Sequence, residues 1–179
     1  ILQGFGSFNV NLLYGITGSG KTEVYIELIR YYLNKGKTVI FLIPEIALTP
    51  QMVDRFQSSF GQILAIQHSQ LTEKDRLIQW QKIKSGKKRI VIGARSAIFA
   101  PLPDLGLIIV DEEHESTYKQ DSAPRYQGRD LSVVRGQIQN AQVILGSATP
   151  ALESWNNALS GKYKLQKLES RPLDYSLPE

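Results

Sequence analysis

Residues 15–22, Gly15-Ile16-Thr17-Gly18-Ser19-Gly20-Lys21-Thr22, match the pattern G-x-x-x-x-G-K-[ST]. The glycines of this pattern let successive backbone N–H groups turn toward one phosphate group. Residues 11–14 before it, Asn-Leu-Leu-Tyr, are typical of a strand, and residues 22–33 after it carry apolar side chains near helical spacing. A strand, a glycine-rich turn and a helix in this order predict a phosphate-binding loop at the positive end of the helix.

This loop predicts which residues bind a nucleoside triphosphate. The residues expected to surround its phosphates are Gly15, Thr17, Gly18, Ser19 and Gly20. Lys21 would reach the β- and γ-phosphates, and the Thr22 hydroxyl would bind Mg²⁺. The alternative is a chance glycine-rich turn, which the strand before and the helix after it disfavour.

Apolar segments that predict strands alternate with amphipathic segments that predict helices. The expected strands are residues 11–14, 38–43, 63–66, 89–92, 107–110, 142–145 and 163–168. The expected helices are residues 22–33, 49–60, 72–85, 128–138 and 151–159, with Thr72 and Asp75 as a capping box. This alternation indicates an α/β fold, with a mostly parallel sheet between helices on both faces. Ligands in such folds bind beyond the carboxyl ends of the strands.

The composition is that of one soluble globular domain. The chain has 179 residues, of which 42% are hydrophobic and 21% charged. It has no Cys and only two His, which excludes disulfides, a thiol nucleophile and a Cys-type zinc site within these residues. Its net charge of +4 permits a polyanionic partner without requiring one. No apolar run approaches the roughly 18 residues of a membrane span, so no membrane association is expected.

An acidic run follows the apolar residues 107–110. Asp111 lies where a carboxylate at a strand end can hold Mg²⁺, directly or through water. Glu112 is placed to orient and deprotonate an attacking water molecule. The alternative is a solvated acidic loop, which the phosphate-binding loop in the same chain disfavours.

Residues 146–150, Gly-Ser-Ala-Thr-Pro, also follow an expected strand. The hydroxyls of Ser147 and Thr149 could relay a change at the γ-phosphate to neighbouring loops. The alternative is a helix cap, with Thr149 at the cap and Pro150 in the first helical position. Both roles are compatible with each other.

Taken in order, these motifs resemble those of superfamily 2 helicases, and more specifically the PriA family of replication-restart helicases. The segments that carry the resemblance are residues 18–25, 44–51, 93–101, 111–114, 118–130 and 146–153. The resemblance implies a RecA-like P-loop NTPase lobe, the first of two, in an ATP-driven motor that unwinds DNA from 3′ to 5′ at stalled forks. It implies ATP and Mg²⁺ as cofactors, and single-stranded and forked DNA, the primosome and single-strand-binding proteins as partners, in the bacterial cytoplasm at the nucleoid.

The resemblance also implies that the chain is a piece of a longer protein. We expect residues 1–168 to be the ATP-binding lobe and residues 169–179 to be a linker toward a second lobe with an arginine finger. The family's zinc-binding cysteines would lie outside these residues. The adenine-reading glutamine segment of such helicases is not recognised here, since Gln3 lacks its flanking pattern.

In helicases of this type the loops after the second and fourth strands face single-stranded DNA. Here those loops carry Glu45, Thr49, Arg95 and Ser96. Arg95 can pair with a phosphate group, although its geometry fits an internal carboxylate equally well. His114 is expected to lie among the contacts between the nucleotide and the DNA sites, or to serve as a hydrogen-bonded structural histidine.

Residues 118–130 interleave aromatic and cationic side chains, which suits stacking on bases and pairing with phosphates. They resemble the aromatic-rich loop that PriA shares with RecQ helicases, where it couples DNA binding to ATP hydrolysis. The residues expected to act there are Tyr118, Arg125, Tyr126 and Arg129, and Gln127 stands where the family often has His. The alternative is an ordered loop held by tyrosine packing and an Arg129–Asp130 pair.

Several other residues are assigned structural roles. Trp80 and Trp155 are expected to be core or half-buried anchors rather than base-stacking side chains. His68 is assigned a structural role. The charged side chains of residues 73–89 are expected to be solvated. Two other functions stay open: a translocase that does not separate strands, and a P-loop switch or binding module, which the Asp111–Glu112 pair disfavours.

Overall fold

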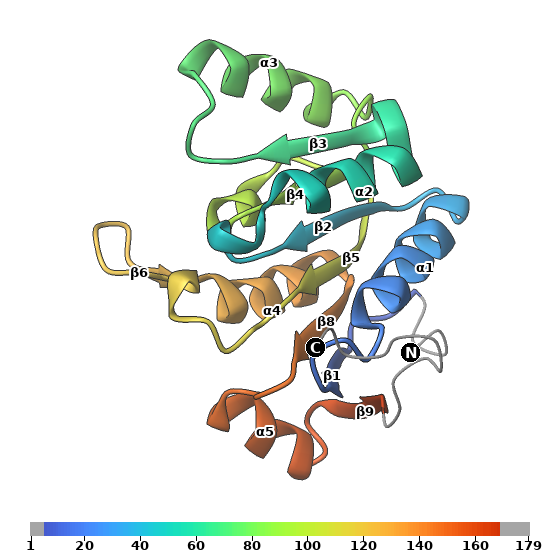
Figure 1. The fold of residues 1–179 in the computed structure, drawn as a ribbon, viewed down its shortest axis with the longest axis vertical. Helices are drawn as coiled ribbons and strands as arrows, with labels where there is room; N and C mark the ends of the chain where they lie inside the picture. Colours follow the sequence, from blue (N-terminus) through green and yellow to red (C-terminus); the bar gives the residue numbers. More distant parts are fainter. Residues whose placement is uncertain (1–5, 169–179) are drawn as a thin grey trace, which may run out of the picture.

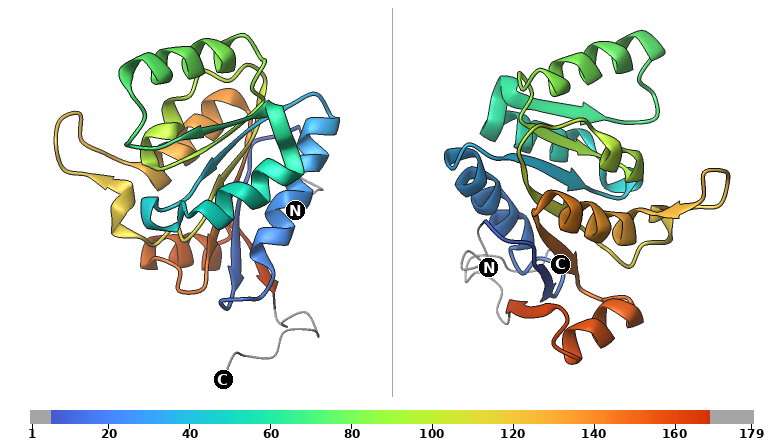
Figure 2. Two further views of the ribbon diagram at one scale, coloured as in Figure 1. Left: turned by 45° about the horizontal axis from the view of Figure 1, so that its top comes forward. Right: turned by 180° about the vertical axis from the view of Figure 1, so that it is seen from behind.

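Residues 6–168 are described by a computed structural model. They form a seven-stranded sheet in the order β3-β4-β2-β5-β8-β1-β9, in which every neighbouring pair is parallel. Helices cover both faces of this sheet (Figures 1 and 2). The predicted α/β fold is therefore confirmed, while the expected linker at 169–179 lies outside the described residues.

The elements follow the expected order closely. The strands of the sheet are β1 (Val10–Gly15), β2 (Thr38–Leu42), β3 (Leu64–Gln67), β4 (Ile90–Gly93), β5 (Leu105–Val110), β8 (Gln142–Ser147) and β9 (Lys164–Leu168). The α-helices are α1 (Lys21–Asn34), α2 (Pro50–Phe60), α3 (Glu73–Lys84), α4 (Gly128–Gln139) and α5 (Leu152–Leu159). Short 3₁₀ turns are η2 (Glu45–Ala47), η3 (Gly61–Ile63), η4 (Arg95–Phe99) and η5 (Ser116–Tyr118).

A small antiparallel ribbon, β6 (Lys119–Gln120) with β7 (Tyr126–Gln127), was not predicted. It projects from the body of the molecule next to α4 (Figure 1). It lies within the aromatic and cationic segment 118–130. Two residues a strand are too few to show a period in the sequence.

Two apolar layers hold the sheet. On one face, α1 and α2 pack through side chains such as Tyr25, Ile29 and Phe56. On the other face, α4 and α5 pack with η4 and with Ile83 of α3. Strand β5 lies between these layers and all six of its residues are buried, which explains its continuous apolar sequence.

Helix caps show where local sequence rules hold and where they fail. Thr72 caps α3 as expected, since its Oγ1 accepts from the Asp75 N–H at 3.1 Å and donates to Asp75 Oδ2 at 2.6 Å. The alternative role of Thr149 as the cap of the last helix is wrong. That helix begins at Leu152, and the N–H of its cap residue Ala151 donates to Glu113 Oε1 at 2.7 Å.

Glu113 is fully buried and joins three segments of the chain. Besides capping α5 it accepts from Ser154 Oγ at 2.8 Å and pairs with Arg129 Nη1 at 3.4 Å. Arg129 also pairs with Asp130 at 2.8 Å, as the alternative interpretation of residues 118–130 predicts, and with Glu153 at 3.6 Å. These contacts of one buried carboxylate tie the end of β5 to α4 and α5.

Two carboxylates on the same arginine give a matched stability test. Glu113→Ala should lower the free energy of unfolding by about 3 kcal/mol, because it leaves the buried Ser154 hydroxyl and the partly buried Ala151 N–H without their acceptor and removes one carboxylate from Arg129. Glu153→Ala should change it by less than about 0.5 kcal/mol, since the Glu153 side chain is 73% exposed. Urea unfolding followed by circular dichroism measures both. Equal losses in the two variants would contradict the role given to Glu113.

Candidate functional site: a nucleotide pocket beside a nucleic-acid groove

The phosphate-binding loop lies between the end of β1 and the start of α1. Gly18 and Gly20 have φ values of 77° and 87°, a left-handed conformation that favours glycine. Gly20 is the cap residue of α1, and no side chain caps this helix. The first N–H groups of α1 are therefore directed at the place where the motif predicts a phosphate group.

The side chains of Lys21 and Ser19 provide the phosphate-binding loop with groups that can donate hydrogen bonds to an anion. Lys21 is buried and its Nζ donates to Gly15 O at 2.8 Å. Ser19 Oγ is buried without a hydrogen-bond partner, which costs about 1–3 kcal/mol unless a ligand or water supplies one. A Cβ atom on residue 15 would lie 2.6 Å from Ser19 Oγ, so this close approach requires glycine. The residues present fit nucleotide phosphates.

The carboxylate of Asp111 is placed by Tyr25 of α1. The Tyr25 hydroxyl donates to Asp111 Oδ1 at 2.8 Å, and the Tyr118 hydroxyl donates to the Asp111 backbone carbonyl at 2.7 Å. Burial raises the pKa of Asp111, while the hydrogen bond from Tyr25 and the charge of Lys21 oppose that rise. A Cβ atom at residue 146 would lie 1.7 Å from Tyr25 Oη, so Gly146 is what lets Tyr25 reach Asp111.

Asp111 and Thr22 are the two residues that the sequence predicts as Mg²⁺ ligands. Within residues 6–168 no group of three or more His, Cys, Asp or Glu side chains is arranged to hold a metal ion. Mg²⁺ commonly uses one or two protein oxygens and completes its shell with water and substrate phosphates. The single carboxylate of Asp111 beside the phosphate-binding loop suits that mode of binding.

Glu112 lies between the phosphate-binding loop and His114. Its φ is 43°, a left-handed conformation that costs a non-glycine residue about 1–3 kcal/mol. Its Oε1 lies 3.7 Å from Lys21 Nζ, and its Oε2 lies 3.6 Å from His114 Nδ1. The chain turns sharply at Glu112, so that three consecutive carboxylates have three different sets of neighbours.

His114 connects Glu112 to the loop after β8. Its Nδ1 lies 2.7 Å from Ser147 Oγ, and its Nε2 lies 3.3 Å from Thr149 Oγ1. Ser147 Oγ also accepts from the Thr149 N–H at 2.9 Å. The structure therefore brings the predicted relay residues Ser147 and Thr149 together. The imidazole ring of His114 connects them to Glu112.

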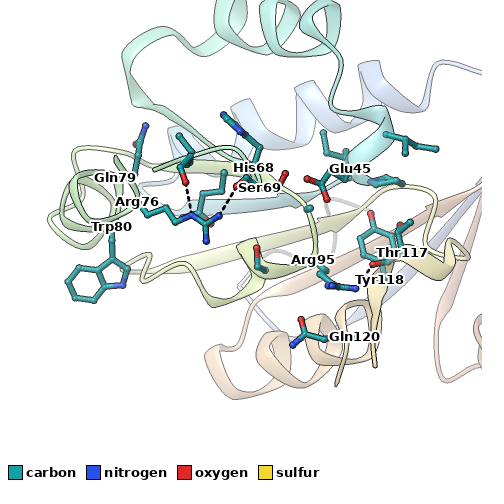
Figure 3. Close-up of a pocket in the computed structure, with 17 residues that line it drawn as sticks. Glu45, His68, Ser69, Arg76, Gln79, Trp80, Arg95, Thr117, Tyr118 and Gln120 are labelled. Atoms are coloured by element: carbon teal, nitrogen blue, oxygen red, sulfur yellow. Dashed lines mark hydrogen bonds between the residues drawn. The ribbon is translucent and has the colours of Figure 1, made fainter. Parts of the chain in front are cut away.

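A pocket of about 710 Å³ lies beside this site, at the carboxyl ends of β2, β3 and β4 (Figure 3). Three predicted DNA-facing residues, Glu45, Arg95 and Ser96, line it together with Tyr118, whereas Thr49 is the cap of α2 and does not. Arg95 Nη1 donates to the backbone carbonyls of Thr117 and Lys119, and thereby holds the 117–119 segment against η4. The other N–H groups of its guanidinium remain for a ligand.

The side chains of the segment 118–130 differ in their surroundings. Tyr118 is buried, and Tyr126 is partly buried with its ring edge-on to Phe99 at 5.2 Å. Arg129 is committed to the carboxylates around α5. Arg125 is exposed, and its Nε donates to Asp121 O at 2.9 Å. Of the four predicted residues, Arg125 is the one most open to a ligand.

Sequence reasoning missed two residues of the site. Tyr25 is one turn beyond Lys21 on α1, yet nothing in the helical pattern distinguishes it from a core tyrosine. Glu113 lies in the acidic run, and its neighbours there conceal that it is the buried member. In both cases the partner is far away in sequence, so no local signal identifies it.

The fold and the site together define a RecA-like P-loop NTPase lobe. The model of the family described as "DEAD/DEAH box helicase" matches residues 7–158, and the chain belongs to that family. Among solved structures, the fold is similar to that of RecG bound to a three-way DNA junction (TM-score 0.67, 23% identity, covering 93% of this chain and 21% of that one). It is also similar to the helicase domain of Pyrococcus furiosus Hef (TM-score 0.62, 18% identity, covering 94% and 36%).

Proteins related in sequence identify a more specific group within this family. The chain is 52% identical to the replication restart protein PriA of Chlamydia pneumoniae over 165 residues, 92% of this chain and 22% of that protein. It is 50% identical to PriA of Bacillus subtilis over 170 residues, 95% of this chain and 21% of that protein. The chain thus spans about a fifth of these relatives, and it fits the first motor lobe of a PriA-type protein.

Removing the Tyr25 hydroxyl should change the titration of Asp111. Tyr25→Phe should raise the pKa of Asp111 further, because a donor to its charged form is lost while burial stays. Tyr32→Phe is the control: Tyr32 is also buried on α1, but its hydroxyl donates to Gln142. Carboxyl ¹³C NMR measures the titration, and an unchanged Asp111 pKa would contradict the assignment.

Tyr25→Phe should also change how the stability of the fold depends on pH. Since the pKa of folded Asp111 already lies above its unfolded value, its contribution to stability is full below the unfolded pKa and is lost as pH rises through the folded pKa. Tyr25→Phe should therefore enlarge the loss of stability between acidic and neutral pH. Thermal unfolding at a series of pH values measures it.

Proposed function

We propose that this chain is the ATP-binding first lobe of a motor that unwinds DNA from 3′ to 5′ at stalled forks during replication restart. The observation that carries the proposal is the position of Glu112, between Lys21 of the phosphate-binding loop and His114 of the path toward Ser147. A module that only binds nucleotide would not need a carboxylate placed to activate water. A water-activating carboxylate joined to a second loop supports a motor.

Each residue of the nucleotide site has a stated role in this proposal. Lys21 and the N–H groups of residues 15–22 hold the phosphates, and Thr22 and Asp111 hold Mg²⁺. Bound Mg²⁺ would neutralise charge on the phosphate oxygens. Glu112 orients water and accepts its proton, which is its role as general base. Tyr25 keeps the Asp111 carboxylate in position through its hydrogen bond.

DNA would bind in the pocket at the ends of β2, β3 and β4. Arg95, Ser96 and η2 line that pocket, and Arg125 stands on the ribbon beside it. The path from Glu112 through His114 to Ser147 and Thr149 would link DNA contact to hydrolysis. A second lobe would supply an arginine finger, which accelerates such reactions by about 10³–10⁵.

The wider setting of the proposal follows from the relatives. The partners would be single-stranded and forked DNA, the primosome and single-strand-binding proteins, with zinc bound elsewhere in the longer protein. We place the protein in the bacterial cytoplasm at the nucleoid. None of the helices within residues 6–168 is long and apolar enough to cross a membrane.

The proposal that the motor separates DNA strands goes beyond ATP hydrolysis and needs a separate test. A translocase without strand separation would use the same nucleotide site. Strand displacement on forked DNA, by a protein that contains this chain and a second lobe, distinguishes the two. Translocation along single strands without displacement of a duplex would leave the ATP site correct and the unwinding proposal wrong.

Two substitutions in that two-lobe protein should separate binding from hydrolysis. Glu112→Gln should lower the rate of ATP hydrolysis by about 10²–10⁴, because an amide cannot accept the proton of water, and should leave ATP affinity nearly unchanged. Lys21→Ala should abolish binding by removing the buried cation of the loop. Calorimetry and phosphate release measure the two properties. Loss of both in Glu112→Gln would instead indicate a structural role.

Arg125→Ala should weaken coupling to DNA while keeping the basal ATPase. Loss of one phosphate contact should raise the DNA concentration for half-maximal stimulation and lower the log–log salt slope by about 1. This variant is cleaner than Tyr126→Ala, since Tyr126 packs on Phe99. Arg30→Ala, which removes an exposed arginine of α1 paired with Glu27, is the control. Stimulation that survives undiminished in Arg125→Ala would contradict the coupling role.

A further inference from the structure

One wall of the pocket comes from a part of the chain that the motifs did not point to. The loop after β3 and helix α3 contribute His68, Ser69, Leu71, Arg76, Gln79 and Trp80. Figure 3 shows Arg76, Gln79 and Trp80 on the far side of the pocket from Tyr118. The pocket thus extends beyond the predicted DNA-facing loops, from the ribbon side to α3.

Trp80 stands at the end of this wall and is more exposed than the core or half-buried anchor that the sequence predicts. Its side chain is 42% exposed, whereas Trp155 is partly buried against the ring of Tyr14 at 5.7 Å. In Figure 3 the indole ring of Trp80 lies at the edge of the pocket, apart from the other labelled side chains. Of the residues of α3, only Ile83 is buried, so packing does not explain a large aromatic side chain at position 80.

The charges and polar groups near Trp80 suit a polyanion with planar bases. Lys84 Nζ lies 4.8 Å from the centroid of the indole ring. Arg76 is fixed by hydrogen bonds to Leu71 O at 3.1 Å and Ser69 O at 2.9 Å, which hold its guanidinium beside the pocket. Gln79 Oε1 is buried without a hydrogen-bond partner. Glu45, on the opposite side, is the one carboxylate among the lining residues.

We infer that α3 forms a base-binding end of the nucleic-acid groove, in which an unpaired base stacks on Trp80 and the adjoining phosphates lie near Arg76 and Lys84. This inference rests on the proposed function and extends it. The ligand is a single strand, because a base inside a duplex has no free face to offer an indole ring. Stacking on an aromatic side chain is tolerant of base identity, so the site takes any sequence.

The chain contains only two tryptophans, which makes a direct test possible. In the Trp155→Phe variant, tryptophan emission reports on Trp80 alone; in Trp80→Phe it reports on Trp155 alone. A short fluorescein-labelled oligothymidylate, at low salt, gives binding by anisotropy in both variants. We expect the emission of Trp80 to be quenched over the same concentrations at which anisotropy rises, and the emission of Trp155 to stay constant.

An affinity measurement separates stacking from a structural role. Trp80→Ala should weaken binding of the oligothymidylate about 10-fold, as expected for loss of one stacked base. It should not weaken binding of an abasic oligomer of the same length, which keeps the phosphates and lacks the bases. Leu77→Ala is the matched control, since Leu77 is exposed on the same helix and does not line the pocket.

The outcomes distinguish the inference from the proposal on which it rests. A rise in anisotropy without quenching of Trp80, or equal losses with the abasic oligomer, would overturn the stacking role and leave the groove intact. Absence of binding in every variant at low salt would overturn the groove and the inference together. Quenching with a base-dependent 10-fold loss supports both.

Discussion

The hydrogen bond from the Tyr25 hydroxyl to the Asp111 carboxylate joins the segments on which the site depends. Tyr25 belongs to α1, which follows the phosphate-binding loop, and Asp111 directly follows β5. The bond forms only because residue 146, in β8, has no Cβ atom to block the tyrosine ring. The bond therefore links the helix that follows the phosphate-binding loop to the carboxylate that is proposed to hold Mg²⁺.

Three consecutive carboxylates follow β5, and the backbone gives each a different environment. Asp111 is held by a tyrosine from one face of the sheet. Glu112, in a left-handed conformation, is directed at Lys21. Glu113 is buried on the other face, where it caps α5 and pairs with Arg129. Strain at Glu112 thus coincides with the position that is proposed to act on water, as strained residues often do at functional sites.

The proposed DNA surface is built from residues that also hold the fold. Arg95 and Arg76 each use part of their guanidinium groups to fix backbone carbonyls, and direct the remaining donors outward. Tyr126 packs on Phe99 and so anchors the ribbon that carries Arg125. Binding groups fixed in this way lose little conformational entropy on contact with a ligand.

The sequence by itself determined the features that depend on neighbouring residues. The phosphate-binding loop, the alternation of strands and helices, and the Thr72 cap all rest on contacts within a few residues, so composition and spacing report them. Only the tertiary structure decided the order of the strands, the bond between Tyr25 and Asp111, the capping of α5 by Glu113 instead of Thr149, and the exposure of Trp80. Each of these is set by segments that are distant along the chain. The periodicity of a helix shows that one face is apolar, but it cannot show what covers that face.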